Sequence, residues 1–180
     1  MVISLLKHKQ FWQDSETSRT ISKEVELPDG TKKVVEGDIH PNGGGFVAKT
    51  AHVPTSVYVA PNAMVLDKAK LGGKVRVEDN AVISGSASVS EEAVVSGNAR
   101  VFENAEIYGN AHISGNAKIF GFACVFGNAQ VSDSASVSGN AVIFGNARIS
   151  GSVEVSGSVQ VFRNAVVSGG GKVSGFLVIH

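Results

Sequence analysis

Beyond Gly45, an aliphatic residue recurs at every sixth position of the chain without interruption. The series runs from Val47 to Ile179, and all 23 of its positions hold Val, Ile or Leu. A second series follows four residues later and is Ala at every step from Ala81 to Ala147. A helix would need its apolar residues to return every 3.6 positions. The period of six therefore predicts short strands joined by corners, with the aliphatic side chain pointing inward and its two neighbours outward.

The residues between these apolar positions fit such corners. Many of them are Gly-Asn pairs, as at Gly97-Asn98, Gly109-Asn110 and Gly127-Asn128. Glycine and asparagine tolerate a positive φ, which tight corners often require. The β-branched residues that dominate the inward series favour strands.

The repeat units resemble a known family. Segments such as VSGNAR (95–100) and ISGNAK (113–118) resemble the hexapeptide repeat of bacterial acyltransferases. The segment 44–47, leading into the repeats, is similar to that of uncharacterised bacterial and phage proteins of a transferase-like class. The resemblance implies an all-β fold, a left-handed parallel β-helix of triangular section with three hexads per coil. The repeats would then form about 7–8 coils of about 18 residues.

The first 45 residues lack the repeat and define a separate N-terminal segment, 1–45, ahead of the β-helix, 46–180. Its residues 21–36 predict a β-hairpin that turns at 28–30, where the sequence reads Pro-Asp-Gly. Residues 2–12 predict a short strand or helix carrying Phe11 and Trp12. Two interpretations stay open: the segment caps the first coil, or it contacts a partner or another subunit.

If one circuit takes 18 residues, side chains 18 positions apart lie on one face. An outward aromatic column results, and a second outward column runs beside it and includes an unpaired cysteine. An apolar stripe of this size predicts an interaction surface, and the family resemblance implies a homotrimer. The alternative is that residues 1–45 of the same chain cover the stripe. The interface residues predicted in this way are Tyr108, Cys124, Phe126, Val142, Phe144 and Phe162.

A second face brings two cations together with two aromatic rings. Arg100 and Lys118 fall one above the other, with Phe102 and Phe120 alongside. Like charges on neighbouring strands repel each other unless an anion or an acid lies between them. These four residues predict a binding site for a small anionic aromatic ligand such as a nucleotide. The alternative is that the cations are solvated and neutralised by nearby acidic residues.

Evidence for catalysis is sparser. The acyltransferase resemblance implies a histidine base near a loop that leaves the helix, with acyl-CoA in the groove between subunits. The six-residue count never breaks here, so no such loop is expected. His112 is the candidate base, and an ordinary surface histidine is the competing interpretation. The histidines His52 and His112 fall on different faces, so no metal site is expected.

The charge and hydropathy of the chain argue against several classes of function. Sixteen basic and sixteen acidic residues give no net charge, which argues against bulk electrostatic binding to nucleic acid or to an anionic membrane. No run of 18 apolar residues occurs, and the N-terminus lacks a signal-peptide pattern, so a cytoplasmic location is expected. Together these features predict a non-catalytic oligomeric scaffold or ligand-binding β-helix without a cofactor. An acyl-CoA-dependent acyltransferase is the alternative.

Overall fold

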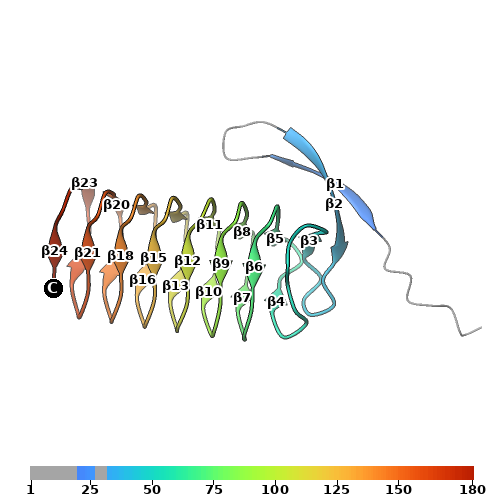
Figure 1. Cartoon of the computed structure of the whole chain (residues 1–180), viewed down its shortest axis with the longest axis horizontal. Coiled ribbons are helices and arrows are strands. Elements are labelled where there is room, and N and C mark those ends of the chain that lie inside the picture. The colour runs from blue at the N-terminus through green and yellow to red at the C-terminus, as the bar shows by residue number, and fades with distance from the viewer. Residues whose placement is uncertain (1–19, 27–31) are drawn as a thin grey trace, which may run out of the picture.

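The protein is a rod of stacked coils with a β-hairpin at one end (Figure 1). The computed structural model describes residues 20–26 and 32–180, and every regular element among them is a β-strand. The predicted turn at 28–30 and the predicted element at 2–12 lie outside the described residues. From β4 (Tyr58–Val59) onward, the strands follow one another around three walls.

Each wall of the rod is one sheet. Sheet A contains, in spatial order, β1 (Ile21–Glu26), β2 (Lys32–Ile39), β3 (Phe46–Ala48), β5 (Met64–Val65), β8 (Val82–Ile83), β11 (Arg100–Val101), β14 (Lys118–Ile119), β17 (Ser136–Val137), β20 (Ser152–Val155) and β23 (Gly170–Val173). Sheet B contains β6 (Lys70–Leu71), β9 (Ser88–Val89), β12 (Glu106–Ile107), β15 (Cys124–Val125), β18 (Val142–Ile143), β21 (Gln160–Val161) and β24 (Val178–Ile179). Sheet C contains β4, β7 (Arg76–Val77), β10 (Val94–Val95), β13 (His112–Ile113), β16 (Gln130–Val131), β19 (Arg148–Ile149) and β22 (Val166–Val167).

The coil closes every eighteenth residue, as the family resemblance implies. Arg100 pairs in parallel with Lys118 on sheet A, and Glu106 pairs with Cys124 on sheet B. The inward aliphatic and alanine series fill the interior, and nearly all of their members from Val57 to Val161 are fully buried. The positions beside the corners hold small side chains, mostly alanine and in a few coils valine, as at Val57 and Val75.

The corners adopt the left-handed backbone conformation that the Gly-Asn pairs predict. Gly109, Gly127 and Gly145 stack along one corner with φ values of 73°, 71° and 71°. Asparagine side chains continue the stacking, and Asn110 donates to Asn128, which donates to Asn146. These bonds satisfy polar groups between coils, so the corners help to hold the stack together.

Some corners place an acidic residue in the left-handed position that glycine takes elsewhere. Asp67, Asp79 and Asp133 have φ values of 56°, 54° and 59°. Each carboxylate accepts a hydrogen bond from the backbone N–H of the glycine one coil further along, at 2.9–3.0 Å. This bond to a charged acceptor offsets the cost of a left-handed conformation with a side chain.

The N-terminal hairpin extends sheet A beyond the first coil. Strands β1 and β2 pair antiparallel, as predicted, and β2 pairs antiparallel with β3. Val25 of the hairpin is buried together with Phe46 and Ala48 of β3 and with Leu66, which directly follows β5. The hairpin thus covers the edge of sheet A and an apolar part of its outer surface.

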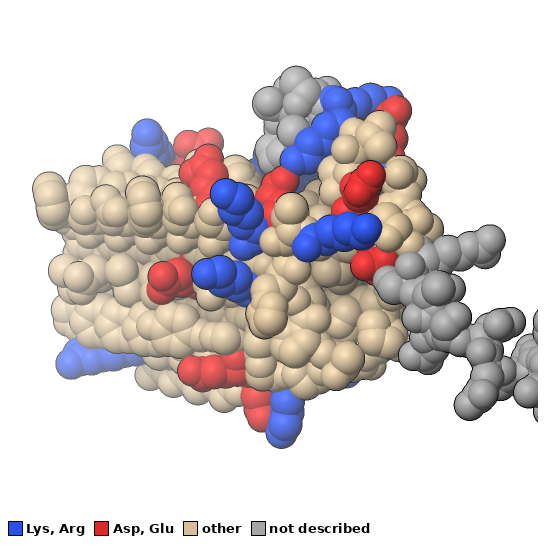
Figure 2. Space-filling view, turned by 45° about the vertical axis from the view of Figure 1, so that its right-hand side comes forward, with Lys and Arg blue, Asp and Glu red and all other residues tan. Residues whose placement is uncertain are grey.

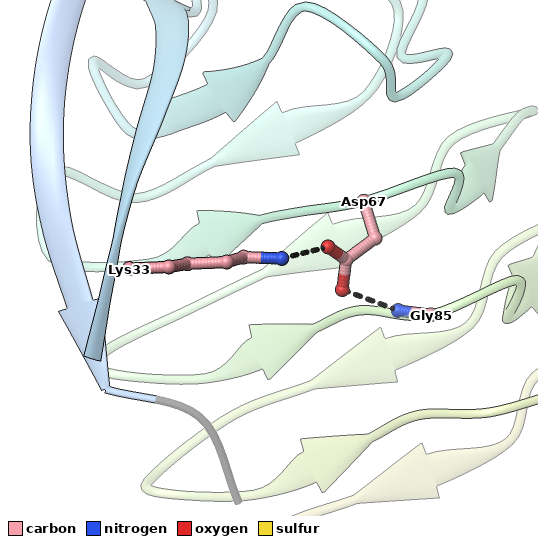
Figure 3. Close-up of polar contacts among 3 residues, drawn as sticks. All are labelled: Lys33, Asp67 and Gly85. Atoms are coloured by element: carbon pink, nitrogen blue, oxygen red, sulfur yellow. Dashed lines mark hydrogen bonds and ion pairs between the residues drawn. The ribbon is translucent and has the colours of Figure 1, made fainter. Parts of the chain in front are cut away.

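One ion pair joins the hairpin to the second coil. Lys33 Nζ lies 2.5 Å from Asp67 Oδ1, and Asp67 Oδ2 accepts from the Gly85 N–H at 3.0 Å (Figure 3). Charged side chains gather around the hairpin and the first coils, whereas the rod further along is mostly uncharged on the face seen in Figure 2. On this face, charge is therefore concentrated near the hairpin end of the rod.

The fold-class prediction is confirmed, because the described chain is an all-β, three-walled parallel β-helix of about seven turns with an N-terminal hairpin. Left-handedness stays an implication of the family resemblance, and the division at residue 45 stays a prediction. No helix long and apolar enough to cross a membrane occurs in the part of the chain that the structure describes.

Candidate functional site

The aromatic column predicted from the sequence forms a continuous ladder on the outside of sheet B. Tyr108, Phe126, Phe144 and Phe162 stack in that order, with centroids 4.8, 5.1 and 4.9 Å apart and planes within 9° of parallel. All four side chains are only partly buried. The rings stack along the rod axis because their spacing is that of neighbouring strands. Their outer edges form an apolar ridge, which we call the aromatic ladder.

The cysteine beside the ladder contacts its first ring. Cys124 Sγ donates to the Tyr108 hydroxyl oxygen at 3.7 Å, and Cys124 is partly buried. Burial, followed by the contact with Cys124, raises the pKa of Tyr108 to about 12. Burial also raises the pKa of Cys124, although the Tyr108 hydroxyl acts in the opposite direction. The thiol is therefore protonated near neutral pH and is a poor nucleophile there.

The two cations and two rings predicted on sheet A also come together, and we call these four residues the cationic patch. Arg100 and Lys118 are register partners on β11 and β14, and both are exposed. Phe102 and Phe120 stack with centroids 4.9 Å apart and planes 4° from parallel. The ion pairs formed among the described residues involve neither Arg100 nor Lys118. Glu103, one of the acids nearby in sequence, instead accepts from the Gly121 N–H at 2.9 Å.

The cationic patch adjoins the part of sheet A that the hairpin covers. Val82 packs against the hairpin cluster around Val25 and is also the register partner of Arg100. On the other side, the corner from sheet A to sheet B carries Phe122, whose side chain is 66% exposed. The patch therefore borders the hairpin cluster, and the exposed Phe122 follows Phe120 at the adjoining corner.

His112, the candidate base, lies on sheet C with an exposed side chain. Its Nδ1 is 2.8 Å from the Asn110 carbonyl oxygen. Because a carbonyl can only accept, this contact favours a proton on Nδ1 and a lone pair on Nε2. Its register partners are Val94 and Gln130, so the neighbouring strands supply no carboxylate to it.

Sheet B lies between the two candidate sites in each coil. The chain passes from Phe102 on sheet A to Tyr108 on sheet B and then to His112 on sheet C. The aromatic ladder on sheet B therefore has the wall of the cationic patch before it and the wall of His112 after it along the chain.

The other histidines that the structure describes lie apart from the two candidate sites. No group of three histidine, cysteine, aspartate or glutamate side chains suited to a metal ion occurs among residues 20–26 and 32–180. His52 is exposed, and its backbone forms an isolated parallel β-bridge with Lys70. His40 is almost fully buried near the hairpin.

Two surface features were missed in the sequence interpretation. His180 extends the aromatic ladder, with its ring 5.7 Å from that of Phe162. Its position 18 residues after Phe162 could have revealed it. Phe122 occupies a corner position that is Asn104 one coil earlier and Asn140 one coil later. This replacement of asparagine by phenylalanine in an otherwise polar column could have revealed Phe122 as an exposed aromatic residue.

The fold and the repeat define a class, a three-walled parallel β-helix built from six-residue repeats. Among solved structures, the protein is similar to the acetyltransferase domain of PglB from Neisseria gonorrhoeae FA1090, with a TM-score of 0.55 and 18% identity. The match covers 72% of this chain and 54% of that one, so the chain spans about half the length of the matched structure. At this identity the likeness establishes the fold alone. No protein-family model and no curated protein matches the sequence.

Proposed function

We propose that the protein is a non-catalytic, oligomeric β-helix that associates through the aromatic ladder, most simply as a homotrimer. The observation that carries the proposal is the unbroken stack from Tyr108 to Phe162, whose apolar edges face outward. Burying such a surface against another copy would remove apolar area from water, which favours association. Cys124 and Val142 flank the ladder on the same sheet and would enlarge the contact.

Oligomeric state tests this proposal directly. The mass of the full chain is measured by light scattering, and Phe144→Glu is compared with Gln130→Glu, a matched change on exposed sheet C. We expect a trimer for the parent and for Gln130→Glu. The Phe144→Glu variant should be monomeric, because the new carboxylate would lose its water at the centre of the contact between subunits. A monomeric parent, or an unchanged mass for Phe144→Glu, would remove the ladder as the interface.

The same assembly would provide a ligand site. The cationic patch combines two exposed cations with two stacked rings, a combination that suits a small anionic aromatic ligand such as a nucleotide. The proposed location beside sheet B would place such a ligand in a groove between subunits. A scaffold that binds a nucleotide-like molecule is thus the function that this geometry supports best.

Adenosine monophosphate is a suitable probe of the patch. Calorimetric titration should show binding that weakens with added salt, because exposed charges are screened. The Arg100→Ser, Lys118→Ser double variant should bind at least about tenfold more weakly, whereas Arg148→Ser on sheet C should bind like the parent. Equal affinity in the parent and the double variant would exclude the patch as the site.

An acyl-CoA-dependent acyltransferase is the second candidate function. Two observations favour it: the likeness to an acetyltransferase domain, and the Asn110 carbonyl that leaves Nε2 of His112 free to accept a proton. Hydrolysis of acetyl-CoA, or transfer of its acetyl group, that is present in the parent and lost in His112→Ala would support the acyltransferase hypothesis. Absence of any turnover with acetyl-CoA would favour the non-catalytic assembly.

A further inference from the structure

A polar pocket opens on sheet C beside β4 and β7, at the hairpin end of the rod (Figure 1). It has a volume of about 460 Å³, which lies within the range of small-molecule sites. The polar side chains of its wall are those of Asn42, Ser56, Tyr58, Lys74, Arg76 and Glu92. None of them belongs to the aromatic ladder or the cationic patch. All but the partly buried Tyr58 are exposed, so a small molecule can reach them.

Backbone hydrogen bonds hold the walls of this pocket together. The Asn42 carbonyl accepts from the Val59 N–H at 3.0 Å, and Asn42 Nδ2 donates to the Thr55 carbonyl at 3.2 Å. The Tyr58 N–H donates to the Val75 carbonyl at 2.9 Å. These bonds connect the turn after β2, the loop before β4 and the next coil. The shape of the pocket is therefore present before any ligand binds.

Arg76 is held in one orientation in the pocket wall. Its Nε donates to Glu78 Oε1 at 2.6 Å, and its Nη2 lies 2.6 Å from the same oxygen. Its guanidinium carbon lies 4.9 Å from the centre of the Tyr58 ring, and Tyr58 is its register partner on β4. Glu78 thus holds one edge of the guanidinium group, and Tyr58 covers one of its faces.

The opposite edge of the guanidinium group is available to a ligand. Nη1 and the second N–H of Nη2 form no hydrogen bond with any residue that the structure describes. Two N–H groups on one edge of a guanidinium match the two oxygens of a carboxylate. Arg148 lies in the same outward column of sheet C, but it has neither an acidic nor an aromatic partner among the described residues. The fixed orientation is therefore a feature of Arg76 and not of every arginine on this wall.

The charges around the pocket favour a ligand with a single negative charge. Lys74 Nζ lies 3.4 Å from Glu92 Oε1, and both side chains are largely exposed, so water weakens this pair. With Arg76 and Glu78, the four charges cancel. The site therefore supplies no net charge to offset the lost hydration of a ligand, and that loss is much larger for a dianion than for a monoanion. A carboxylate is favoured over a phosphate for this reason.

We propose that this pocket binds a small hydroxylated carboxylate, such as a sugar acid, with the carboxylate on the available edge of Arg76. Ser56 and Tyr58 each carry a hydroxyl group without a hydrogen bond to any described residue, and the Asn42 amide carries a further acceptor. Hydroxyl groups both donate and accept, so they suit such a mixed wall. The proposal is independent of the function assigned to the aromatic ladder and the cationic patch.

The test is a calorimetric titration of the full chain with sodium gluconate. Sorbitol keeps the carbon chain and the hydroxyl groups without the carboxylate, and hexanoate keeps the carboxylate without the hydroxyl groups. We expect saturable binding of gluconate and at least about tenfold weaker binding of both controls. The absence of saturable gluconate binding, or equal binding of sorbitol, would overturn the proposal. Equal binding of hexanoate, or tighter binding of glucose 6-phosphate, would show that the ligand class is wrong.

Variants locate the site. Arg76→Lys keeps the positive charge but loses the planar pair of N–H groups, so gluconate should bind at least about tenfold more weakly. Arg148→Lys is the matched control on the same wall and should bind like the parent. Thermal melts check that both variants fold. If Arg76→Lys is unfolded, the comparison of gluconate with sorbitol on the parent chain decides alone. Unchanged affinity in a folded Arg76→Lys variant would contradict the proposal.

Discussion

Lys33 Nζ and Asp67 Oδ1 are 2.5 Å apart, although 34 residues separate them in the chain. The other oxygen of the same carboxylate accepts from the Gly85 N–H in the next coil (Figure 3). Asp67 therefore connects three parts of the molecule: the hairpin, its own corner of the β-helix and the same corner one coil further along. This relationship gives the hairpin a polar anchor in addition to the apolar contacts of Val25.

Removing the hairpin side of this anchor should cost little but measurable stability. The side chains of Lys33 and Asp67 are 40% and 29% exposed, so solvent screens the pair, and Lys33→Met should lower the free energy of unfolding by about 1 kcal/mol or less. Lys74→Met is the matched control, because the Lys74–Glu92 pair is longer at 3.4 Å and more exposed. Urea unfolding measures both. An equal loss in the two variants would contradict a structural role for Lys33.

Acid should weaken the same connection. Partial burial by itself would raise the pKa of Asp67, but the hydrogen bonds from Lys33 and Gly85 and the Lys33 charge lower it below 3.8. The unfolded chain then binds a proton more readily than the folded one. The carboxylate contributes its full stability above pH 3.8, and this contribution is lost as the pH falls through the lower folded value.

Asp67→Asn should consequently melt at a lower temperature than the parent at pH 7, and the difference should shrink below pH 3.8. Thermal unfolding between pH 7 and pH 2 measures the two midpoints. Asparagine is a suitable replacement because it tolerates the φ of 56° at this position. A difference that stayed constant with pH would show that the charge of Asp67 does not stabilise the fold.

The corner glycines should be intolerant of alanine. Gly127 has a φ of 71°, and a Cβ there would lie 3.1 Å from the Gly145 backbone nitrogen. Gly127→Ala should cost about 1–2 kcal/mol for the left-handed conformation, and the close contact adds to it. In Gly72→Ala the new Cβ would meet no atom within 4 Å, and the φ of Gly72 lies outside the left-handed region. That control should change stability by less than about 0.5 kcal/mol. Equal midpoints of urea unfolding for Gly127→Ala and Gly72→Ala would show that the left-handed corner does not require glycine.

Cys124 should react slowly with alkylating agents. Burial raises the pKa of Cys124 above 9.0, the Tyr108 hydroxyl lowers it, and the Glu106 carboxylate adds to the rise. Because the thiolate is the reactive form, the iodoacetamide rate of the native chain should reach half its maximum at a higher pH than that of the urea-unfolded chain. Tyr108→Phe removes the group that lowers the pKa, so the midpoint should rise further. A midpoint that falls in Tyr108→Phe would reverse this assignment.

Much of the fold and of the outer surface could be predicted from the sequence. The 18-residue circuit places Arg100 over Lys118 and Phe126 over Tyr108, and both relationships hold in the structure. The prediction works because each coil packs only on its neighbours, so a constant repeat length determines which side chains meet. The repeat length determines which side chains lie together on the surface, but not which molecule binds them. Binding of another subunit or of a ligand therefore stays a prediction.

The amino-acid sequence by itself determined the six-residue repeat and its inward and outward series. The family resemblance supplied the three hexads per coil, and with them the aromatic column on one wall. Only the tertiary structure decided how the first described residues join the repeats, with β2 pairing to β3, Lys33 reaching Asp67, and Asn42 lining a pocket beside β4. The physical reason is that contacts inside the repeat recur at a fixed separation along the chain. The contacts of the hairpin follow no period, and they depend on a path that no local pattern specifies.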